Sequence, residues 1–393
     1  MLNVARSTMH VIVLLYRNAL RHRLRTALTI VGITVAILAF GLLRTVVSAW
    51  YAGVNASSSS RLITRNAISL VFSLPISYLD RMKRIEGVKE VSYANWFGGV
   101  YITEKNFFAN FAIEPRSYLE LYPEFVLPSE QKREFLLDRK ACVAGRKLAE
   151  RYGWKIGDII TLKGTIFPGT WEFVLRGIYS GAEPSTDESQ FFFHWAYLNE
   201  TLRKTIPRRA DQVGVYVIGL NNPLVAAETS LAVDAVFRNS LAETLTETEK
   251  AFQLSFVSMT EAIVVAIRIV SYVVIIIIMA VVANTMAMTA RERIGEYAIF
   301  KAMGFRNYHI AGMIFGESLF ISMSGCLAGI LLTFPVANKF AEEMGQFFPI
   351  FIIERSTLYL DIVFCILVGL IAALFPAWRA ARIRIAEGLR RIG

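Results

Sequence analysis

Four long apolar stretches constrain the fold of this chain more than any other feature of its sequence. They cover residues 27–49, 269–289, 308–334 and 358–377, and charged segments bound each of them. About 20 consecutive apolar residues are enough to cross the hydrocarbon core of a bilayer as a helix. The mean hydropathy of +0.45 is also too high for an ordinary soluble domain. The sequence therefore predicts an α-helical membrane protein with four transmembrane helices.

The net charge of +10 is concentrated beside these stretches. Residues 1–49 contain six arginines and no acidic residue, and residues 290–307 contain four basic residues against two acidic ones. The tail from residue 379 has five arginines against one glutamate, whereas residues 335–357 are slightly acidic. By the positive-inside rule, both termini and residues 290–307 are cytoplasmic, and residues 50–262 lie outside. Membrane proximity explains the basic clusters, so we expect no nucleic-acid binding.

Residues 50–245 alternate strand and helix signals and predict a large α+β extracytoplasmic domain between the first two helices. A strand at 67–73 precedes a helix from Pro75, another strand signal covers 88–103, and VGVYVIGL at 213–220 precedes a second helix that opens at Pro223. Two such pieces predict a split ferredoxin-like subdomain. An insertion at about residues 116–197 predicts a β-rich subdomain. Only Cys142 lies outside the spans, so the domain has no internal disulfide.

The remaining segments divide at the span boundaries. Residues 1–26 predict an amphipathic helix on the inner membrane surface or, alternatively, a simple stop-transfer charge cluster. No Pro or Gly interrupts the chain from residue 246 to Gly295, which predicts one helix of about 40 residues, a stalk continuous with the second span, over 246–290. A cytoplasmic coupling helix at 291–307, a third span at 308–334, an outer loop at 335–357, a fourth span at 358–378 and a cytoplasmic C-terminal helix at 379–393 follow.

Enzyme signatures are missing from the sequence. It has no GxxxxGK[ST] loop, so it cannot hydrolyse ATP by a P-loop mechanism on its own. HExxH, GxSxG and zinc-ligand spacings are also missing, and the four histidines are scattered. His194, in FFFHW, is expected to be packed. We therefore predict a protein without catalytic residues, bound cofactor or metal.

The most informative stretch is MTARERIGEYAIFKAMGFRNYH at residues 288–309. It predicts a short amphipathic helix with Ile294, Ala298, Ile299 and Ala302 on one side, ending at Gly304. Such a helix fits the cleft of a cytoplasmic partner, and it also fits an interfacial helix that lies on lipid. The residues alone leave both interpretations open.

RERIGEYAIFKAMGF in this stretch resembles the coupling segment of FtsX-like, MacB-type (type VII) ABC transporter permeases, a group that includes the DevC-like and LolC-like permeases. The resemblance extends over nearly the whole chain, through NALRHRLRTALTIVGI, GWKIGDIITL and PAWRAARIRIAEGLR. It implies a multi-pass permease of the bacterial inner membrane that forms a homo- or heterodimer and binds a separate cytoplasmic ATPase. That ATPase would hold ATP and Mg and drive the outer domain through the stalk, a process called mechanotransmission.

The resemblance also implies roles for individual residues. The ATPase-coupling element would be Arg291, Glu292, Glu296, Lys301, Met303, Gly304 and Phe305. The C-terminal cytoplasmic helix would contribute Arg379, Arg382, Glu387 and Leu389.

Several functions are compatible with this resemblance. A MacB-like permease exports small molecules or other substrates with a periplasmic adaptor and an outer-membrane channel, whereas a LolC-like permease extracts lipoproteins from the membrane. An FtsX-like regulator transports nothing and activates cell-wall hydrolases, but its outer domain is usually much smaller. A ligand sensor beside a kinase is a further alternative.

Small residues in the third span predict close helix packing. Gly312, Gly316, Ser322, Gly325 and Gly329 follow a small-xxx-small spacing, which lets helices approach each other closely in a membrane. Glu317 is taken as the only acid well inside a span. An intramembrane acid indicates either function, such as proton or ion coupling, or pairing with a basic residue, and we favour pairing.

Overall fold

The computed structural model describes residues 23–345 and 347–383, which fold as two compact units. The helical unit takes its residues from Met1–Ala49, Glu261–Glu342 and Phe351–Gly393. The α/β unit comprises Trp50–Thr260 with Glu343–Ile350. Each unit has its own buried apolar core.

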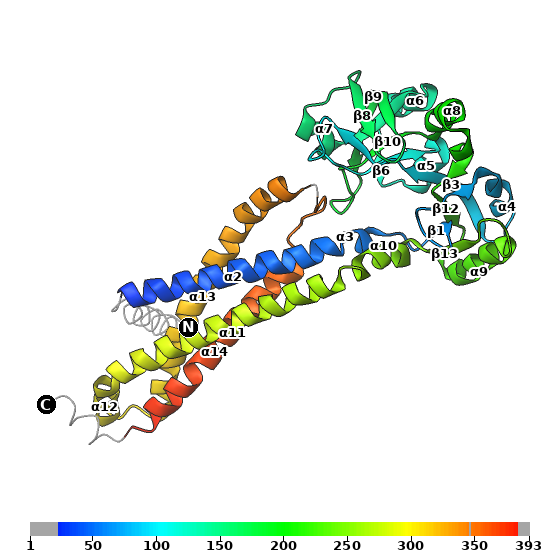
Figure 1. The fold of residues 1–393 in the computed structure, drawn as a ribbon. Helices are drawn as coiled ribbons and strands as arrows, with labels where there is room; N and C mark the ends of the chain where they lie inside the picture. Colours follow the sequence, from blue (N-terminus) through cyan, green and yellow to red (C-terminus); the bar gives the residue numbers. More distant parts are fainter. Residues whose placement is uncertain (1–22, 346, 384–393) are drawn as a thin grey trace. The chain divides into compact units, whose positions relative to one another are not determined.

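Four helices of the helical unit are long and apolar enough to cross a membrane (Figure 1). They are α2 (Arg23–Trp50), α11 (Glu261–Glu292), α13 (Asn307–Met344) and α14 (Arg355–Ala381). A short helix, α12 (Ile294–Ala302), connects α11 to α13. Many apolar side chains of these four helices remain exposed, as expected of helices that face lipid. The prediction of four helices able to span a membrane is therefore confirmed.

Small residues bring α13 close to α2. A Cβ atom on Gly325 would lie 2.6 Å from the Cβ of Ile33, and one on Gly329 would lie 2.8 Å from the Cβ of Ile37. Both distances are too short for a real contact, so these two positions require glycine unless the helices move apart. A Cβ on Gly312 would meet no atom of the described chain within 4 Å.

Serine side chains join α13 to α14. The Ser318 Oγ donates to the Gly369 carbonyl at 2.8 Å, and the Ser322 Oγ donates to the Cys365 carbonyl at 2.5 Å. Gly316, the remaining small residue of the predicted stripe, is half-buried. The side of α13 that carries the small residues therefore packs against two different helices.

The sequence predicted that the third helix ends at Phe334, but the helix is longer. Helix α13 continues through Pro335 to Met344, so the predicted loop at 335–357 was started about ten residues too early. Proline removes one backbone hydrogen bond but is tolerated within long membrane helices. The residues after Pro335 are good enough helix formers to continue the helix beyond the apolar run.

The predicted continuous stalk helix from residue 246 is also wrong. Residues 244–248 form a strand, α10 (Glu249–Ser258) follows, and α11 begins only at Glu261. The Thr248 side chain caps α10 by accepting from the Ala251 N–H at 3.2 Å. At the break, the Ser258 and Thr260 hydroxyls donate to backbone carbonyls three residues earlier, a local bonding pattern that competes with helix continuation.

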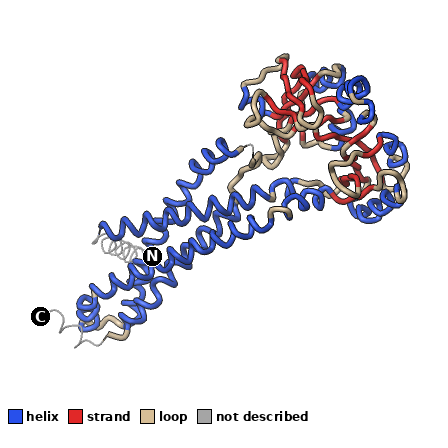
Figure 2. The backbone as a smooth tube through the Cα atoms, viewed as in Figure 1, coloured by secondary structure: helices blue, strands red, loops and turns tan. Residues whose placement is uncertain are grey.

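One sheet of 11 strands forms the centre of the α/β unit, shown by the red segments of Figure 2. Its order is β13-β1-β12-β3-β5-β10-β7-β9-β8-β4, and β6 pairs with β9. The strands are β1 (Arg61–Asn66), β3 (Val88–Trp96), β4 (Gly99–Tyr101), β5 (Asn110–Ile113), β6 (Phe125–Val126), β7 (Ala141–Gly145), β8 (Ile159–Gly164), β9 (Gly169–Gly181), β10 (Phe191–His194), β12 (Val215–Leu220) and β13 (Thr244–Thr248). A separate pair consists of β2 (Leu74–Pro75) and β11 (Gln212–Val213).

Helices pack on this sheet and bury both of its faces. They are α4 (Leu79–Met82), α5 (Pro115–Leu121), α6 (Ser129–Leu137), α7 (Arg146–Tyr152), α8 (Trp195–Thr205), α9 (Ala226–Phe237) and α10, while α3 (Ala52–Ala56) packs against α10. In β10, Phe191 and Phe193 belong to one apolar core and Phe192 to another, because successive strand residues point to opposite faces. His194 is buried, and its Nε2 lies 2.6 Å from the Phe135 carbonyl oxygen.

The two predicted subdomains share this single sheet. Strands β7 to β10 of the insertion pair with strands from outside it at both ends, with β5 through β10 and with β4 through β8. The predicted strand at 67–73 is wrong, since those residues form a loop and the strand is Arg61–Asn66. Apolar composition misled the prediction, because Ile68 and Val71 are 81% and 87% exposed.

Candidate functional site

A tight turn ends α12 and starts the return of the chain into α13. Gly304 has a φ of +95°, a conformation that favours glycine. The Gly304 N–H donates to the Lys301 carbonyl and the Phe305 N–H to the Phe300 carbonyl, both at 3.0 Å. The Phe300 and Phe305 rings pack with their centroids 5.6 Å apart. These bonds and this contact form a Schellman motif, so the sequence FKAMGF sets the direction in which the chain leaves α12.

Arg293 holds α12 against α13. Its Nη1 donates to the Glu317 Oε2 at 2.8 Å, and its Nε donates to the Glu296 Oε2 at 2.9 Å. The side chains of Arg293 and Glu317 are only 7% and 6% exposed. Glu317 is therefore the counter-ion of Arg293. The sequence analysis counted Arg293 among the basic residues but did not single it out.

Two further contacts hold the ends of this segment. The Arg25 guanidinium of α2 donates to both carboxylate oxygens of Glu292 in α11, at 3.0 Å and 2.7 Å. The Lys301 Nζ donates to the carbonyls of Ala381, the last residue of α14, and of Ile383 just after it, at 2.8 Å and 2.9 Å. Desolvation lowers the pKa of Lys301. Lysine is favourable at this position because the end of a helix carries unpaired carbonyls and a partial negative charge.

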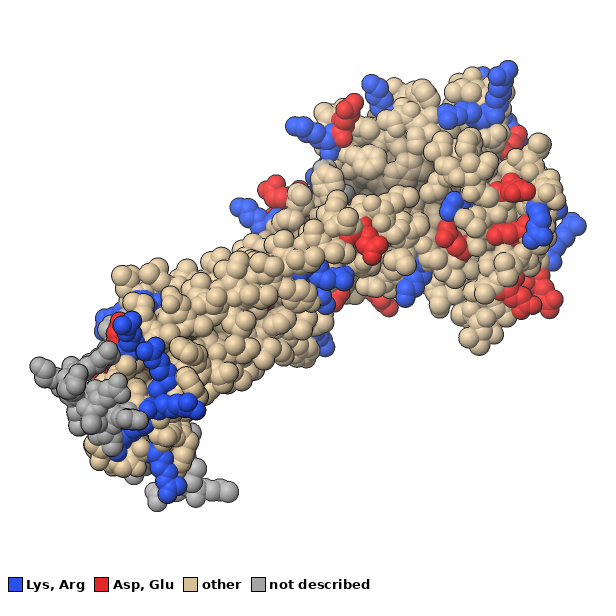
Figure 3. All heavy atoms as spheres, turned by 60° about the horizontal axis from the view of Figure 1, so that its bottom comes forward, with Lys and Arg blue, Asp and Glu red and all other residues tan. Residues whose placement is uncertain are grey.

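The opposite face of α12 is exposed and apolar. Ile299, Met303 and Phe305 are 43%, 61% and 40% exposed and are called the α12 tip below. Tyr297 and Ala298, on the inner face, are buried. In Figure 3, Lys and Arg side chains gather at one end of the helical unit, while the middle of the unit shows almost none on this face.

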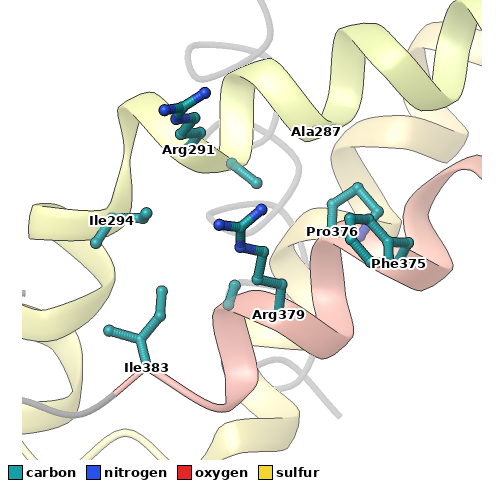
Figure 4. A pocket seen from close by; sticks show the side chains of 9 residues that line it. Ala287, Arg291, Ile294, Phe375, Pro376, Arg379 and Ile383 are labelled. Atoms are coloured by element: carbon teal, nitrogen blue, oxygen red, sulfur yellow. The ribbon is translucent and has the colours of Figure 1, made fainter.

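The two described arginines of the predicted C-terminal helix belong to the end of α14. Arg379 lies in its last turn, and the Arg382 guanidinium lies 4.4 Å above the Trp378 ring. Figure 4 shows Arg379 reaching from α14 toward α11, where it lines a cavity of about 30 Å³ together with Arg291. That volume holds no more than a water molecule or two. Glu387 and Leu389 lie outside the described residues.

A buried ion network lies where the chain enters and leaves the α/β unit. The Arg61 Nε of β1 donates to the Glu249 Oε2 of α10 at 2.8 Å, and the Arg61 Nη2 donates to the Glu124 Oε1 at 2.6 Å. Burial lowers the pKa of Arg61, but the hydrogen bond with Glu124 and the charge of Glu249 outweigh it and hold this pKa above its usual value. The network ties β1, α10 and the segment after α5 together.

Asp361 of α14 is a second acid inside a membrane helix. The prediction that Glu317 is the only acid well inside a span did not consider Asp361, which lies near the start of the fourth apolar stretch in the sequence LYLDIVF. Its side chain is fully buried. Among the described residues, no group of three or more His, Cys, Asp or Glu side chains is arranged to hold a metal ion.

Comparison with known families accounts for both units. Residues 26–236 match the MacB-like periplasmic core domain, and residues 268–385 match the FtsX-like permease C-terminal family. The chain belongs to the MacB-like and FtsX-like ABC transporter permeases. The predicted family and fold class are thereby confirmed. The FtsX-like part of the permease contains α12, the Arg293–Glu317 pair, α13 and α14.

Several individual proteins resemble this permease. An uncharacterized ABC transporter permease of Methanocaldococcus jannaschii, MJ1507, is 24% identical over 97% of each chain. The macrolide export ATP-binding/permease protein MacB of Pectobacterium atrosepticum is 29% identical over 28% of this chain and 17% of its own length. The ABC transporter permease YtrF of Bacillus subtilis is 29% identical over 28% of each chain.

Two crystal structures also align with the permease. The extracellular domain of the noncanonic ABC-type transporter YknZ from Gram-positive bacteria has 11% identity and a TM-score of 0.35, covering 48% of this chain and 100% of that one. The periplasmic region of MacB from Actinobacillus actinomycetemcomitans has 9% identity and a TM-score of 0.36, covering 52% of this chain and 95% of that one.

Proposed function

We propose that this permease is the membrane subunit of an ABC transporter and that its α12 tip docks into a separate cytoplasmic ATPase. The observation that carries the proposal is the contrast between the two faces of α12. Its inner face is fixed by the Arg293–Glu317 pair and by the Lys301 contacts with the end of α14. Its outer face presents Ile299, Met303 and Phe305 to solvent or to a partner.

Charge supports a cytoplasmic position for the α12 tip. Arg291 and Arg306 flank α12 and are exposed, and further basic residues gather at the same end of the helical unit (Figure 3). Basic loops of membrane proteins are retained in the cytoplasm. In this orientation, both termini lie on the cytoplasmic side of a bacterial inner membrane, and the α/β unit lies on the opposite side.

The helix α11 supplies a path from the ATPase to the outer domain. Its 32 residues extend about 48 Å at about 1.5 Å per residue, with no interruption between Glu261 and Glu292. Since α12 is bonded to both α13 and α14, displacement of the tip moves the spans together. We infer that ATP and Mg bind only to the partner. Two permease copies would work as a dimer, and movement of the outer domains would export or extract a substrate such as a lipid, a lipoprotein or a small molecule.

Site-specific cross-linking tests the docking assignment. All three native cysteines are buried, so Met303→Cys introduces the accessible thiol. A photoactivatable cross-linker on this thiol should link the permease to a co-expressed ATPase that hydrolyses ATP. Leu241→Cys, on an exposed residue of the α/β unit, is the matched control and should give no such product.

A charge substitution supplies the energetic test. Met303→Asp should lower recovery of the permease–ATPase complex at least about tenfold, because burial of a methionine side chain is worth about 1.5–3 kcal/mol. A complex of unchanged yield and unchanged ATPase activity with Met303→Asp would show that the α12 tip does not dock there.

A further inference from the structure

The Asp361 carboxyl group is buried among the membrane helices and has no hydrogen-bond partner within the described part of the chain. Its relative exposure is 0%, and neither Oδ1 nor Oδ2 has a hydrogen-bond partner among the described residues. Thr357, one turn earlier on the same face of α14, is also fully buried, and its Oγ1 is likewise unpartnered. Glu317, by contrast, receives a hydrogen bond from the Arg293 guanidinium.

Three helices enclose this carboxyl group. A Cβ atom on Gly41 of α2 would lie 3.6 Å from the Asp361 Oδ2 and 3.4 Å from the Thr333 Oγ1 of α13, so α2, α13 and α14 meet there. The Thr333 hydroxyl already donates to the Gly329 carbonyl, and the Thr45 hydroxyl to the Gly41 carbonyl. Neither hydroxyl therefore has its proton free for Asp361.

No charged side chain neutralises the carboxyl group. The titratable and charged residues within about two turns of Gly41, Thr333 and Asp361 on their own helices are Arg44 on α2, Cys326 and Lys339 on α13, and Arg355, Tyr359 and Cys365 on α14. Tyr272 of α11 packs beside them against Phe40 and Phe364. None of them makes an ion pair or a hydrogen bond with the Asp361 carboxylate oxygens within the described chain. The Cys326 Sγ donates instead to the Asp361 backbone carbonyl at 3.8 Å.

An ionised carboxylate in such surroundings is strongly unfavourable, because it has lost water and gained neither a cation nor a donor. A protonated carboxyl group avoids most of this penalty. We propose that Asp361 is a proton-binding site, neutral in the conformation described here, and that release of the proton separates α14 from α2 and α13. Ionisation then requires water to reach the carboxylate, and water enters only if these helices move apart.

This inference does not depend on the ATPase partner. Both tests below use the full-length permease alone in a bilayer, so failure of ATPase docking leaves their outcome unaffected.

Infrared spectroscopy tests the protonation state directly. At about pH 7 an ordinary carboxyl group is ionised, and the carbonyl stretch of a protonated carboxyl group is resolved from the carboxylate bands. The wild type should show a protonated-carboxyl band that is lost in Asp361→Asn and kept in Glu317→Gln, the intramembrane control. Spectra of equal intensity for wild type and Asp361→Asn would overturn the assignment. Loss of the band on adding sodium, but not choline, would also overturn it in favour of a cation site.

Thiol labelling tests the separation of the helices. Cys326 and Cys365 are 1% exposed and lie on the two helices that would part. The labelling is measured at a pH high enough for the infrared band to have disappeared. There, a membrane-permeant maleimide should label Cys326 and Cys365 about tenfold faster in the wild type than in Asp361→Asn. Cys142, buried in the α/β unit, should show no difference between the two proteins. Equal labelling of Cys326 and Cys365 in both proteins would refute the opening.

Discussion

Removing one partner of the Arg293–Glu317 pair should destabilise the helical unit strongly. In Glu317→Leu, the Arg293 guanidinium loses the 2.8 Å hydrogen bond while remaining in a site where its side chain is 7% exposed. Loss of one partner from a buried ion pair costs about 3–5 kcal/mol, because the other charge stays buried. Arg293→Met should cost a similar amount, since Glu317 then becomes an unpaired charge inside α13.

The double variant Arg293→Met/Glu317→Leu should recover most of this loss. Apolar side chains of similar volume often replace a buried ion pair at no net cost, so we expect its stability to return to within about 1 kcal/mol of the wild type. At about 2–4 °C per kcal/mol for a unit of this size, each single variant should lower the Tm by roughly 6–20 °C. Thermal unfolding of the purified permease, followed by tryptophan fluorescence, gives all four values of the cycle.

The cycle separates a structural role for Glu317 from proton or ion coupling. If the pair is structural, the double variant should also recover stimulation of the ATPase partner. A double variant that lost as much stability as the two single variants together would refute this reasoning. A single-variant cost below about 1 kcal/mol would also refute it. Full stability of the double variant without any coupled activity would instead assign a functional charge to Glu317.

Three further substitutions have specific expected outcomes. Gly304→Ala should cost about 1–2 kcal/mol from positive φ alone, because a Cβ there meets no atom within 4 Å, and co-purification should show weaker ATPase binding with the permease still folded. Gly325→Ala should cost about 1–3 kcal/mol in thermal unfolding by overpacking against Ile33, whereas Gly312→Ala, the matched control, should leave Tm unchanged or higher. Burial lowers the pKa of His194, so the unfolded state binds a proton at a higher pH than the folded state does. The stability should therefore fall as pH drops below about 6.5. Unfolding measured over a series of pH values should show a weaker pH dependence in His194→Gln.

The sequence predicted those parts of the fold that follow from one-dimensional patterns. The length of the apolar stretches located all four spans. Gly304 located the end of α12, because the preference of glycine for a positive φ at a helix end is a local property that does not depend on the rest of the structure. The break at residues 259–260 was missed because no Pro or Gly marks it, and Ser and Thr hydroxyls bond preceding carbonyls inside intact helices as well, as Ser271 does in α11. Asp361 has a clear signal in the sequence, because it is a single acid within the apolar stretch LYLDIVF.

Partners in space were harder to predict than elements. Arg293 and Glu317 are 24 residues apart, and the sequence indicated only that an intramembrane acid needs a counter-ion. The family resemblance assigned Lys301 to the ATPase-coupling element. It did not indicate that the Lys301 Nζ bonds carbonyls 80 and 82 residues further along the chain. Such assignments depend on how helices pack, which small-residue spacing suggests but does not determine.

The ion network of Arg61 constrains how α10 can move against the sheet of the α/β unit. Arg61 opens β1, where the chain enters the sheet, and Glu249 opens α10, where the chain leaves it. Sliding α10 past β1 would separate Arg61 from Glu249, whose side chains are 7% and 8% exposed, and would leave buried charge unpaired at a cost of about 3–5 kcal/mol.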